Sequence, residues 1–491
     1  MKDDARDTIR NASLILLQRG AQTVGGLGFA LLVPRLMGPE QYGRYALATS
    51  VAFWLALVSG LGLVNATTRY VPPLLARGDT PALHRLIGNL FTLRVVSGLV
   101  AALAYLAVGL RWWRDLDPLV PVLIAVAVWA QGLSGYLFSL FLGFNQAARW
   151  AMGDTVRRWL LLALVLVGYY LGGLRGAAAG VLLTELAALA LGFAWSPQLR
   201  GRGVFRPDGR FLAPYLRFGL TSLVTQVLLI AFLGSGEILV RRFSGPYVEV
   251  GYFSLAHGAY LVVATTLPQL MLAFMPLLGQ LRDAGHAAEL ARWSGRLVRV
   301  LAATGVLGVF TTLFLAEACV PLLFGRAYAP VAANLLPLSA ALLALALASV
   351  PGLLALVHER PAETVAAAAL RLAVFWGVAP PLIAHAGSRG ACLAVLAGAG
   401  VHAIYLAWRS RDLMPGALRD WALPVGLGAL FLPFAPFRSG GPMDFVLWCS
   451  GASAYGAALL LLRVVTPGEI SAVAGLLRRG AVKRGERGAA G

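Results

Sequence analysis

The chain has 491 residues, of which 59% are hydrophobic and only 13% charged, and its mean hydropathy is +0.75. A water-soluble protein of this length would need far more polar surface, so the composition excludes that class and predicts a membrane protein. The net charge of +19 could suggest nucleic-acid binding. However, the basic clusters flank apolar segments and have no interleaved aromatic residues, which fits membrane lipid headgroups as partners and not nucleic acid.

Fourteen apolar segments approach the length of about 20 residues that a membrane-spanning helix needs. One of them is short and another contains several prolines, so we predict twelve to fourteen spanning helices. The first segment follows an acidic start and has no small-residue cleavage site at its end, which indicates an anchor and not a removable signal. In chain order the predicted spans are 13–34, 42–66, 86–110, 118–142, 158–172, 175–195, 215–238, 250–275, 298–320, 331–356, 363–385, 390–408, 420–436 and 443–463.

An internal repeat is visible between residues 35–48 and residues 242–256, which match at an offset of 207 and, after a one-residue insertion, of 208 through a glycine, a ring position and a Leu-Ala pair. Both stretches lie between two apolar segments, and each contains a Gly-Pro turn. We predict that these turns act as hinges: Gly38 with Pro39, and Gly245 with Pro246.

A second match relates residues 173–177 to residues 387–391, and Arg157 lies opposite Arg371 at the same offset of 214. Six spans separate equivalent points, so the two copies have the same orientation and are parallel repeats. We therefore predict an all-α polytopic fold with two six-helix repeats around a central cavity and two extra C-terminal helices. The expected domains are the N-terminal lobe 1–195, a basic cytoplasmic linker 196–214, the C-terminal lobe 215–410, the extra helices 411–464 and a basic cytoplasmic tail 465–491.

Most Lys and Arg residues outside the spans fall in segments that are cytoplasmic if the N-terminus is inside. The positive-inside rule therefore predicts that both the N-terminus and the C-terminus are cytoplasmic.

Ionisable residues within the spans are few, and such residues usually face the protein interior or a water-filled cavity. The first span has a polar face made of Arg19, Gln22 and Thr23, and the first span of the second lobe has a similar face with Thr225 and Gln226. Two such faces predict a central polar cavity. The candidate substrate-binding residues are Arg19, Gln22, Thr23, Arg94, Thr225, Gln226 and Arg371.

Each of these charges also has a structural alternative. Arg19 can bind a ligand or can be a snorkelling or ion-paired helix end. Arg94 and Arg371 can instead pair with Glu185 or Glu363 and only hold helices together. Glu185 lies in the middle of a span, where it can couple a proton or serve as the counter-ion of an arginine.

Catalytic and nucleotide-binding motifs are missing from the sequence: there is no G-x-S-x-G, no Walker A motif, no H-E-x-x-H and no acidic metal cluster. The cysteines Cys319, Cys392 and Cys449 fall within spans at unrelated spacings, which suggests neither a disulfide frame nor a metal site. We therefore expect no enzyme activity, no cofactor and no metal. The energy for transport would come from an ion gradient, the membrane potential or the gradient of the substrate.

The stretch that begins at Val33 and includes Gly38-Pro39-Glu40 and Tyr42-Gly43, with Gly60-Leu61-Gly62 and Arg69 further on, resembles the opening signature of the polysaccharide flippases. These are O-antigen and capsule repeat-unit exporters of the multidrug/oligosaccharidyl-lipid/polysaccharide exporter superfamily. The turn 323–328 is similar to a second feature of the family. The resemblance implies two lobes around a cationic cavity in the inner membrane. It also implies alternating access, which would move a polyprenyl-diphosphate-linked glycan from the inner to the outer leaflet.

Three other functions remain open at this point. A multidrug or cation antiporter of the same superfamily would be expected to present acidic residues to its substrate. A membrane glycan polymerase or ligase would need a sizeable external loop with catalytic residues, and the predicted loops are short. A non-transporting scaffold is the third alternative, and polysaccharide assembly proteins are candidate partners of the chain.

Overall fold

The computed structural model describes residues 2–113, 115–144, 146–196, 209–414, 417–464, 466 and 468. Within these residues, the side chains of 2–23, 147, 209–210, 221–222, 224–226, 228–230, 233 and 417–418 are outside the description. The described residues form helices and connecting turns, with no strand among them. The predicted all-α polytopic membrane fold is confirmed.

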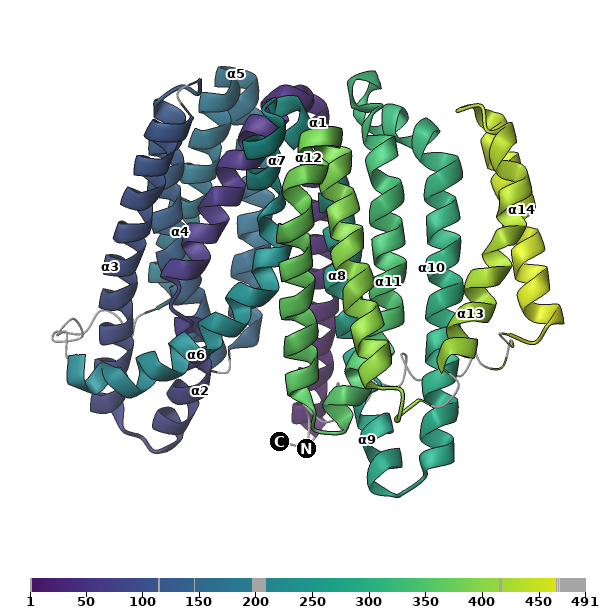
Figure 1. Ribbon diagram of the computed structural model, residues 1–491. Helices are drawn as coiled ribbons and strands as arrows, with labels where there is room; N and C mark the ends of the chain where they lie inside the picture. Colours follow the sequence, from purple (N-terminus) through teal and green to yellow (C-terminus); the bar gives the residue numbers. More distant parts are fainter. Residues whose placement is uncertain are drawn as a thin grey trace. The chain divides into compact units, whose positions relative to one another are not determined.

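The chain divides into two compact units, Met1–Ile238 and Leu239–Gly491. The helices of the first unit are α1 (Lys2–Ser59), α2 (Leu63–Ala76), α3 (Thr80–Trp112), α4 (Leu119–Gly143), α5 (Ala147–Trp195) and α6 (Gly209–Gly234), and α7 (Gly236–Ser244) crosses the boundary (Figure 1). The second unit contains α8 (Tyr247–Leu272), α9 (Met275–Asp283), α10 (Ala287–Phe324), η2 (Arg326–Tyr328), α11 (Val331–Val357), α12 (Pro361–Arg409), α13 (Ala417–Leu427), η3 (Gly428–Phe437) and α14 (Pro442–Leu461).

The long helices α5 and α12 are each folded into a hairpin of two arms. Each has 49 residues, which would span about 74 Å as a straight helix, against a hydrocarbon core of about 30 Å. Both are broken by a glycine with positive φ, Gly173 in α5 and Gly387 in α12. These breaks coincide with the repeated motif that the sequence predicted as a turn between two spans.

Nine helices among the described residues are long and apolar enough to cross a membrane. The pair 24–59 and 63–76, which is bent by 41° at a short break, counts as a tenth if the two helices form one span. This count takes α5 and α12 as one helix each, although each contains two arms joined at a break.

The helix α6 packs within the first unit, against α1 and α2. Tyr70 of α2 contacts Tyr215 of α6 edge-on, with ring centres 4.8 Å apart, and the indole N–H of Trp54 donates a hydrogen bond to the carbonyl oxygen of Gly234 at 2.8 Å. The sequence placed this span in the C-terminal lobe, 215–410. The lobe boundaries rest on the repeat and stay a prediction.

The second unit has its core between α10 and α11, where Leu297, Val298, Val350 and Leu354 are fully buried. The extra C-terminal helices α13 and α14 pack on α10 (Figure 1). The predicted span 420–436 begins as the α-helix α13 but continues as the 3₁₀-helix η3, which contains two prolines. Proline lacks the N–H that an α-helix needs, so the α pattern is not continued there.

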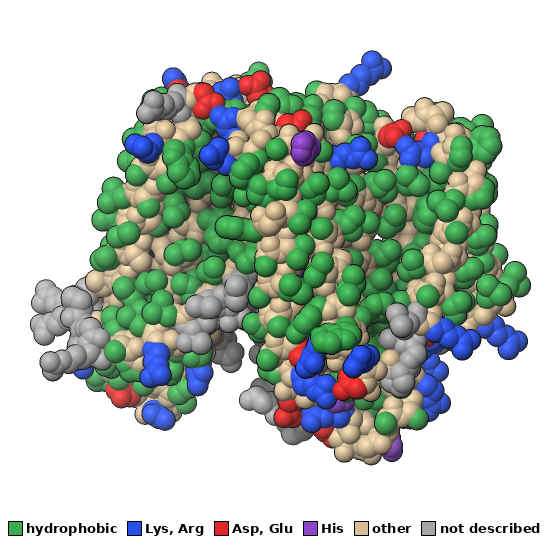
Figure 2. All heavy atoms as spheres, in the orientation of Figure 1, with side chains coloured by type: hydrophobic (Ala, Val, Ile, Leu, Met, Phe, Trp, Pro, Cys, Tyr) green, Lys and Arg blue, Asp and Glu red, His purple; other side chains and the backbone are tan. Residues whose placement is uncertain are grey.

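Charge follows the membrane pattern along the helices of each unit. Apolar side chains cover their middle, and Lys, Arg, Asp and Glu gather towards their two ends (Figure 2). Large apolar side chains are strongly exposed on the outer faces, for example Val100 on α3 at 61%, Ile404 on α12 at 69% and Leu461 on α14 at 81%. Such exposure is expected when hydrocarbon is the solvent.

Candidate functional site: charged residues within the helical units

Five of the predicted substrate-binding residues have side chains outside the described part of the chain. Arg19, Gln22 and Thr23 belong to α1, and Thr225 and Gln226 belong to α6. Their role in a polar cavity therefore stays a prediction. Three of the ionisable residues that the sequence singled out have described and buried side chains: Arg94 in α3, Glu185 in α5 and Arg371 in α12.

Arg94 is a buried side chain of α3 that joins three helices, with 7% of its surface exposed. Its Nε donates a hydrogen bond to the carbonyl oxygen of Gly132 in α4 at 2.8 Å. Its Nη1 donates to the hydroxyl of Ser59 at 3.1 Å, and its Nη2 to the carbonyl oxygen of Ala56 at 3.3 Å. The missing Cβ of Gly132 makes room for this, because a Cβ there would lie 2.8 Å from Nη2.

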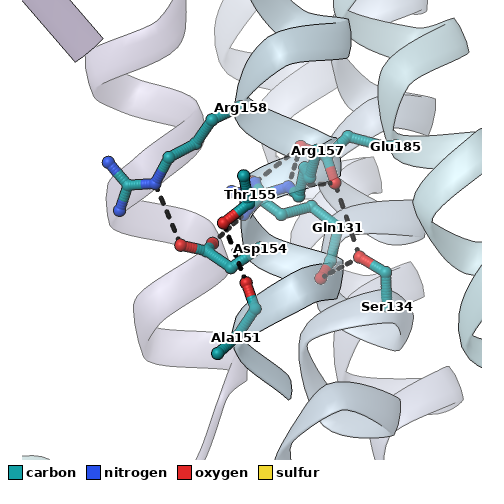
Figure 3. Close-up of polar contacts among 8 residues, drawn as sticks. All are labelled: Gln131, Ser134, Ala151, Asp154, Thr155, Arg157, Arg158 and Glu185. Carbon is teal, nitrogen blue, oxygen red and sulfur yellow. Dashed lines mark hydrogen bonds and ion pairs between the residues drawn. The ribbon is translucent and has the colours of Figure 1, made fainter. Parts of the chain in front are cut away.

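The α5 hairpin contains a buried ion pair (Figure 3). Arg157, in the first arm, approaches Glu185, in the second arm, with its Nη2 2.6 Å from Oε1. The Nε of Arg157 also lies 3.0 Å from each carboxylate oxygen. Ser134 of α4 donates a hydroxyl hydrogen bond to Glu185 at 3.4 Å. Glu185 is 3% exposed, so its charge is offset by a bidentate guanidinium contact, the strong form of this interaction.

Asp154, one turn before Arg157 in α5, lies on the more exposed side of this ion pair. Asp154 binds Arg158 at 2.9 Å and lies 4.0 Å from Arg157 (Figure 3). Arg157 thus stands between a deeply buried carboxylate and a partly exposed one. The sequence left open whether Glu185 couples a proton or pairs with an arginine, and the structure shows it paired with Arg157.

Sequence analysis did not identify Arg157 as the partner of Glu185, and offered Arg94 or Arg371 instead. The two residues are 28 positions apart, and only the antiparallel hairpin brings them together. The glycines Gly168, Gly176 and Gly180 were the sequence signal for this hairpin register. In the structure the two arms touch at these glycines, Gly168 against Gly176 and Leu164 against Gly180. Continuing that register along the hairpin brings Arg157 within one helical turn of Glu185.

In the second unit, Arg371 of α12 is 6% exposed. It lies close enough to Tyr260 of α8 and His402 of α12 to interact electrostatically. Glu363, the other predicted partner, instead binds Arg409 at 2.9 Å, where the two ends of the α12 hairpin meet. A substrate-binding role for Arg371 stays a prediction.

The two Gly-Pro turns have the backbone that their sequence suggests. Gly38 has φ 73° and Gly245 has φ 91°, values that favour glycine. Pro39 follows the first break inside α1, and Pro246 is the residue that precedes α8. Whether the turns move as hinges stays a prediction.

The polar groups described above are fixed cations and ion pairs, an arrangement suited to holding helices together or offsetting a negative charge. Among the described residues, no group of three or more His, Cys, Asp or Glu could hold a metal ion. The three cysteines are free.

Comparison with known proteins shows which family the chain resembles. A family model described as "Polysaccharide biosynthesis protein" matches residues 8–282. The lipid III flippase of Escherichia coli (strain K12) is 28% identical over an alignment of 272 residues that covers 51% of this chain and 63% of that protein, and the lipid III flippase of Shigella flexneri matches equally. The chain thus spans 63% of the length of these curated relatives.

Two solved structures share the fold across most of the chain. A structure of the lipid II flippase MurJ in an inward closed conformation has a TM-score of 0.66 at 12% identity, and covers 90% of this chain and 98% of its own. An inward-facing multidrug resistance MATE family transporter of the MOP superfamily has a TM-score of 0.65 at 16% identity, and covers 82% of this chain and 98% of its own.

The family expected from the sequence is confirmed by these matches. The family model covers more than half of the chain, and the shared fold extends beyond the matched region into the second unit. The chain is a multi-pass membrane protein that belongs to the polysaccharide biosynthesis protein family.

Proposed function

We propose that this protein is a flippase for lipid-linked oligosaccharides, which moves a polyprenyl-diphosphate-linked glycan repeat unit from the inner to the outer leaflet for cell-surface polysaccharide synthesis. The observation that carries the proposal is the family match over residues 8–282, in a region 28% identical to a lipid III flippase. The relatives named above are flippases and transporters, which supports a transporter and not an enzyme.

The physical difficulty of this reaction is the diphosphate, whose negative charge must cross a medium of low dielectric constant. Guanidinium groups held in place along the path offset the cost of removing water from that charge. Arg19, with Gln22 and Thr23 on the same helix face, is our first candidate for this role, and Thr225 and Gln226 would supply the facing polar surface. The polyprenyl tail would stay in the bilayer while the headgroup crosses by alternating access between the two lobes.

The proposed location is the inner membrane, with both termini cytoplasmic, because Lys and Arg concentrate in the segments that this orientation places inside. Polysaccharide assembly proteins are the proposed partners. Since the sequence contains no nucleotide-binding motif, an ion gradient, the membrane potential or the substrate gradient would drive transport.

A multidrug or cation antiporter is the alternative that the shared fold with a MATE transporter favours. A cationic substrate would need a carboxylate that can turn towards it. The two most buried acids of the hairpins are already bound to arginine, Glu185 to Arg157 and Glu363 to Arg409. These contacts make the flippase the better-supported function.

The proposal is tested in proteoliposomes that contain a labelled polyprenyl-diphosphate oligosaccharide. We expect the purified protein to expose the inner-leaflet label to an external glycosidase, and Arg19→Ala to abolish most of this activity at equal protein level. Arg292→Ala is the control, because the Arg292 side chain is 65% exposed and forms an ion pair with the neighbouring, exposed Glu289. Failure to move the labelled lipid, together with efflux of a cationic dye, would support the antiporter instead.

A further inference from the structure

The α1–α2 connection is a break in a membrane-spanning helix, and its backbone hydrogen bonds are rearranged. The break has positive φ at Leu61 (49°) and at Gly62 (66°). The N–H of Gly60 donates to the carbonyl oxygen of Leu57, and that of Leu63 to Gly60. In a continuous α-helix those two N–H groups would reach the carbonyls of Ala56 and Ser59. The break therefore takes their usual donors away from these two carbonyls.

Two side chains of α3 supply replacements at these same carbonyls. The Nη2 of Arg94 donates to the carbonyl oxygen of Ala56 at 3.3 Å, beside the Ser59 hydroxyl, which donates to the same oxygen at 3.0 Å. The hydroxyl of Ser97 donates to the carbonyl oxygen of Ser59 at 2.8 Å. Arg94 and Ser97 are three positions apart, so they lie on one face of α3. A second Arg94 nitrogen binds the Ser59 hydroxyl at 3.1 Å.

We propose that Arg94 and Ser97 act as built-in donors that hold the α1–α2 break in one geometry, and that Arg94 is a positioning residue and not a contact for substrate. In the membrane, water cannot replace a lost backbone donor, so a broken span needs neighbouring side chains to satisfy its carbonyls. Arg94 suits this task because its planar guanidinium reaches three acceptors on two helices at once. Two of them, in Ala56 and Ser59, belong to α1, and the third is the carbonyl oxygen of Gly132 in α4.

The break that Arg94 holds is also the place where α6 crosses. A Cβ on Gly62 would lie 2.0 Å from the carbonyl oxygen of Gly219, and a Cβ on Gly219 would lie 2.5 Å from that of Leu61. The two backbones are therefore in direct contact within the first unit. A loosened break would move the surface on which α6 rests, so Arg94 positions α6 without touching it.

The test uses the glycine that makes room for the guanidinium. Gly132→Ala adds a methyl group 2.8 Å from Nη2 of Arg94, while Gly135→Ala, on the same helix, meets nothing within 4 Å. Both variants change helix propensity equally, so Gly135→Ala is a matched control. Hydrogen–deuterium exchange is measured on the full chain in lipid nanodiscs, for the amides of residues 60–63.

We expect Gly132→Ala to accelerate exchange at these amides about tenfold, because the methyl group removes roughly one buried hydrogen bond from a charged donor. Gly135→Ala should leave the exchange rate unchanged. Arg94→Lys should behave like Gly132→Ala, because one ammonium group cannot reach all three acceptors. Ser97→Ala should give a smaller acceleration. Equal exchange in the wild type, Gly132→Ala and Arg94→Lys would overturn the proposal.

A transport measurement separates positioning from substrate binding, and this part alone rests on the proposed function. If Arg94 is a positioning residue, Gly132→Ala and Arg94→Lys lower the maximal flipping rate and leave the apparent affinity for the labelled lipid unchanged. If Arg94 contacts the diphosphate, Arg94→Lys weakens the apparent affinity, which contradicts the proposal. Absence of flipping in the wild type would refute the proposed function, and the exchange result would still stand.

Discussion

The hairpins α5 and α12 have nearly the same backbone and different charges. Their breaks have almost equal angles, with φ 56° and ψ −140° at Gly173 and φ 54° and ψ −133° at Gly387. Just after each break the arms touch, Gly176 against Gly168 in α5 and Gly390 against Leu382 in α12. The internal repeat is therefore a repeat of structure as well as of sequence.

The charges inside the two hairpins have diverged. Arg157 has an equivalent in Arg371, but the residue 214 positions after Glu185 is Ala399. The first hairpin thus neutralises its arginine with a carboxylate from its own second arm, whereas the second hairpin places Arg371 near Tyr260 and His402. Duplication preserved the features that a helical turn requires, and the polar interior changed independently in each half.

The largest effect is expected at the contact between the arms, where the two hairpins should respond alike. A Cβ on Gly176 would lie 1.8 Å from the carbonyl oxygen of Gly168, and one on Gly390 would lie 2.0 Å from that of Leu382. Backbone cannot move aside as a side chain can, so Gly176→Ala and Gly390→Ala should each abolish folded protein, as judged by fluorescence-detected size exclusion. Gly400→Ala, which meets nothing within 4 Å, should fold normally. Normal folding of either arm-contact variant would show that the arms are further apart.

The ion pair should distinguish the hairpins. Glu185→Gln leaves the Arg157 guanidinium without its carboxylate, which typically costs about 3 to 5 kcal/mol for a buried pair. We expect the lower end of that range, because the Arg157 side chain is 26% exposed. Arg157→Leu combined with Glu185→Leu should recover most of the loss in thermal unfolding measurements. If Glu185→Gln is as stable as the wild type, the pair contributes no more than a surface ion pair.

The turn glycines should show a smaller difference between the halves. Gly173→Ala and Gly387→Ala both force a side chain into a strained conformation, at a cost of about 1 to 3 kcal/mol. At Gly387 the added Cβ would also lie 2.5 Å from Oε2 of Glu249, whereas at Gly173 nothing lies within 4 Å. Gly387→Ala should therefore unfold at the lower temperature. The reverse order would contradict the placement of Glu249, which accepts a hydrogen bond from the N–H of Ser388 at 2.7 Å.

The smallest effect is expected at the open end of α12. The hydrogen bond from Arg360 to Asp412, 3.0 Å long, lowers the pKa of that carboxyl group below its usual value. A carboxyl group with a lowered pKa stabilises the fold at pH values above its usual pKa of about 4. This stabilisation is lost as the pH falls through the lowered pKa. Asp412→Asn should cost under about 1 kcal/mol at pH 7, since the pair is exposed. The exposed Asp283→Asn is the control, and a larger effect there than at Asp412 would refute the assignment.

Much of the fold could be predicted from the sequence, because hydrophobic length and glycine placement are local signals. The turns at Gly173 and Gly387 and the pair of Gly-Pro turns all fall where the repeat placed them. The 3₁₀ geometry of η3 was missed, although its prolines were visible. The packing of α6 on α1 and α2 was also missed, because it depends on contacts between distant glycines that no hydropathy pattern reports.

The candidate site was less predictable than the fold. Sequence reasoning singled out Arg94 and Glu185, but a charge at membrane depth does not reveal its partner. Arg94 binds carbonyl groups released by a helix break, and Glu185 binds Arg157 across a hairpin. Both partners follow from tertiary register, which becomes visible only when the arms and breaks are placed in space.

Native mass spectrometry of the protein purified gently from its own host would show which lipids remain bound, and so whether its substrate is a lipid-linked glycan. We expect a polyprenyl-diphosphate glycan to stay bound to the protein, and its mass to identify the repeat unit. Retention of phospholipids alone, with ready binding of added cationic drugs, would contradict the flippase assignment and support the antiporter.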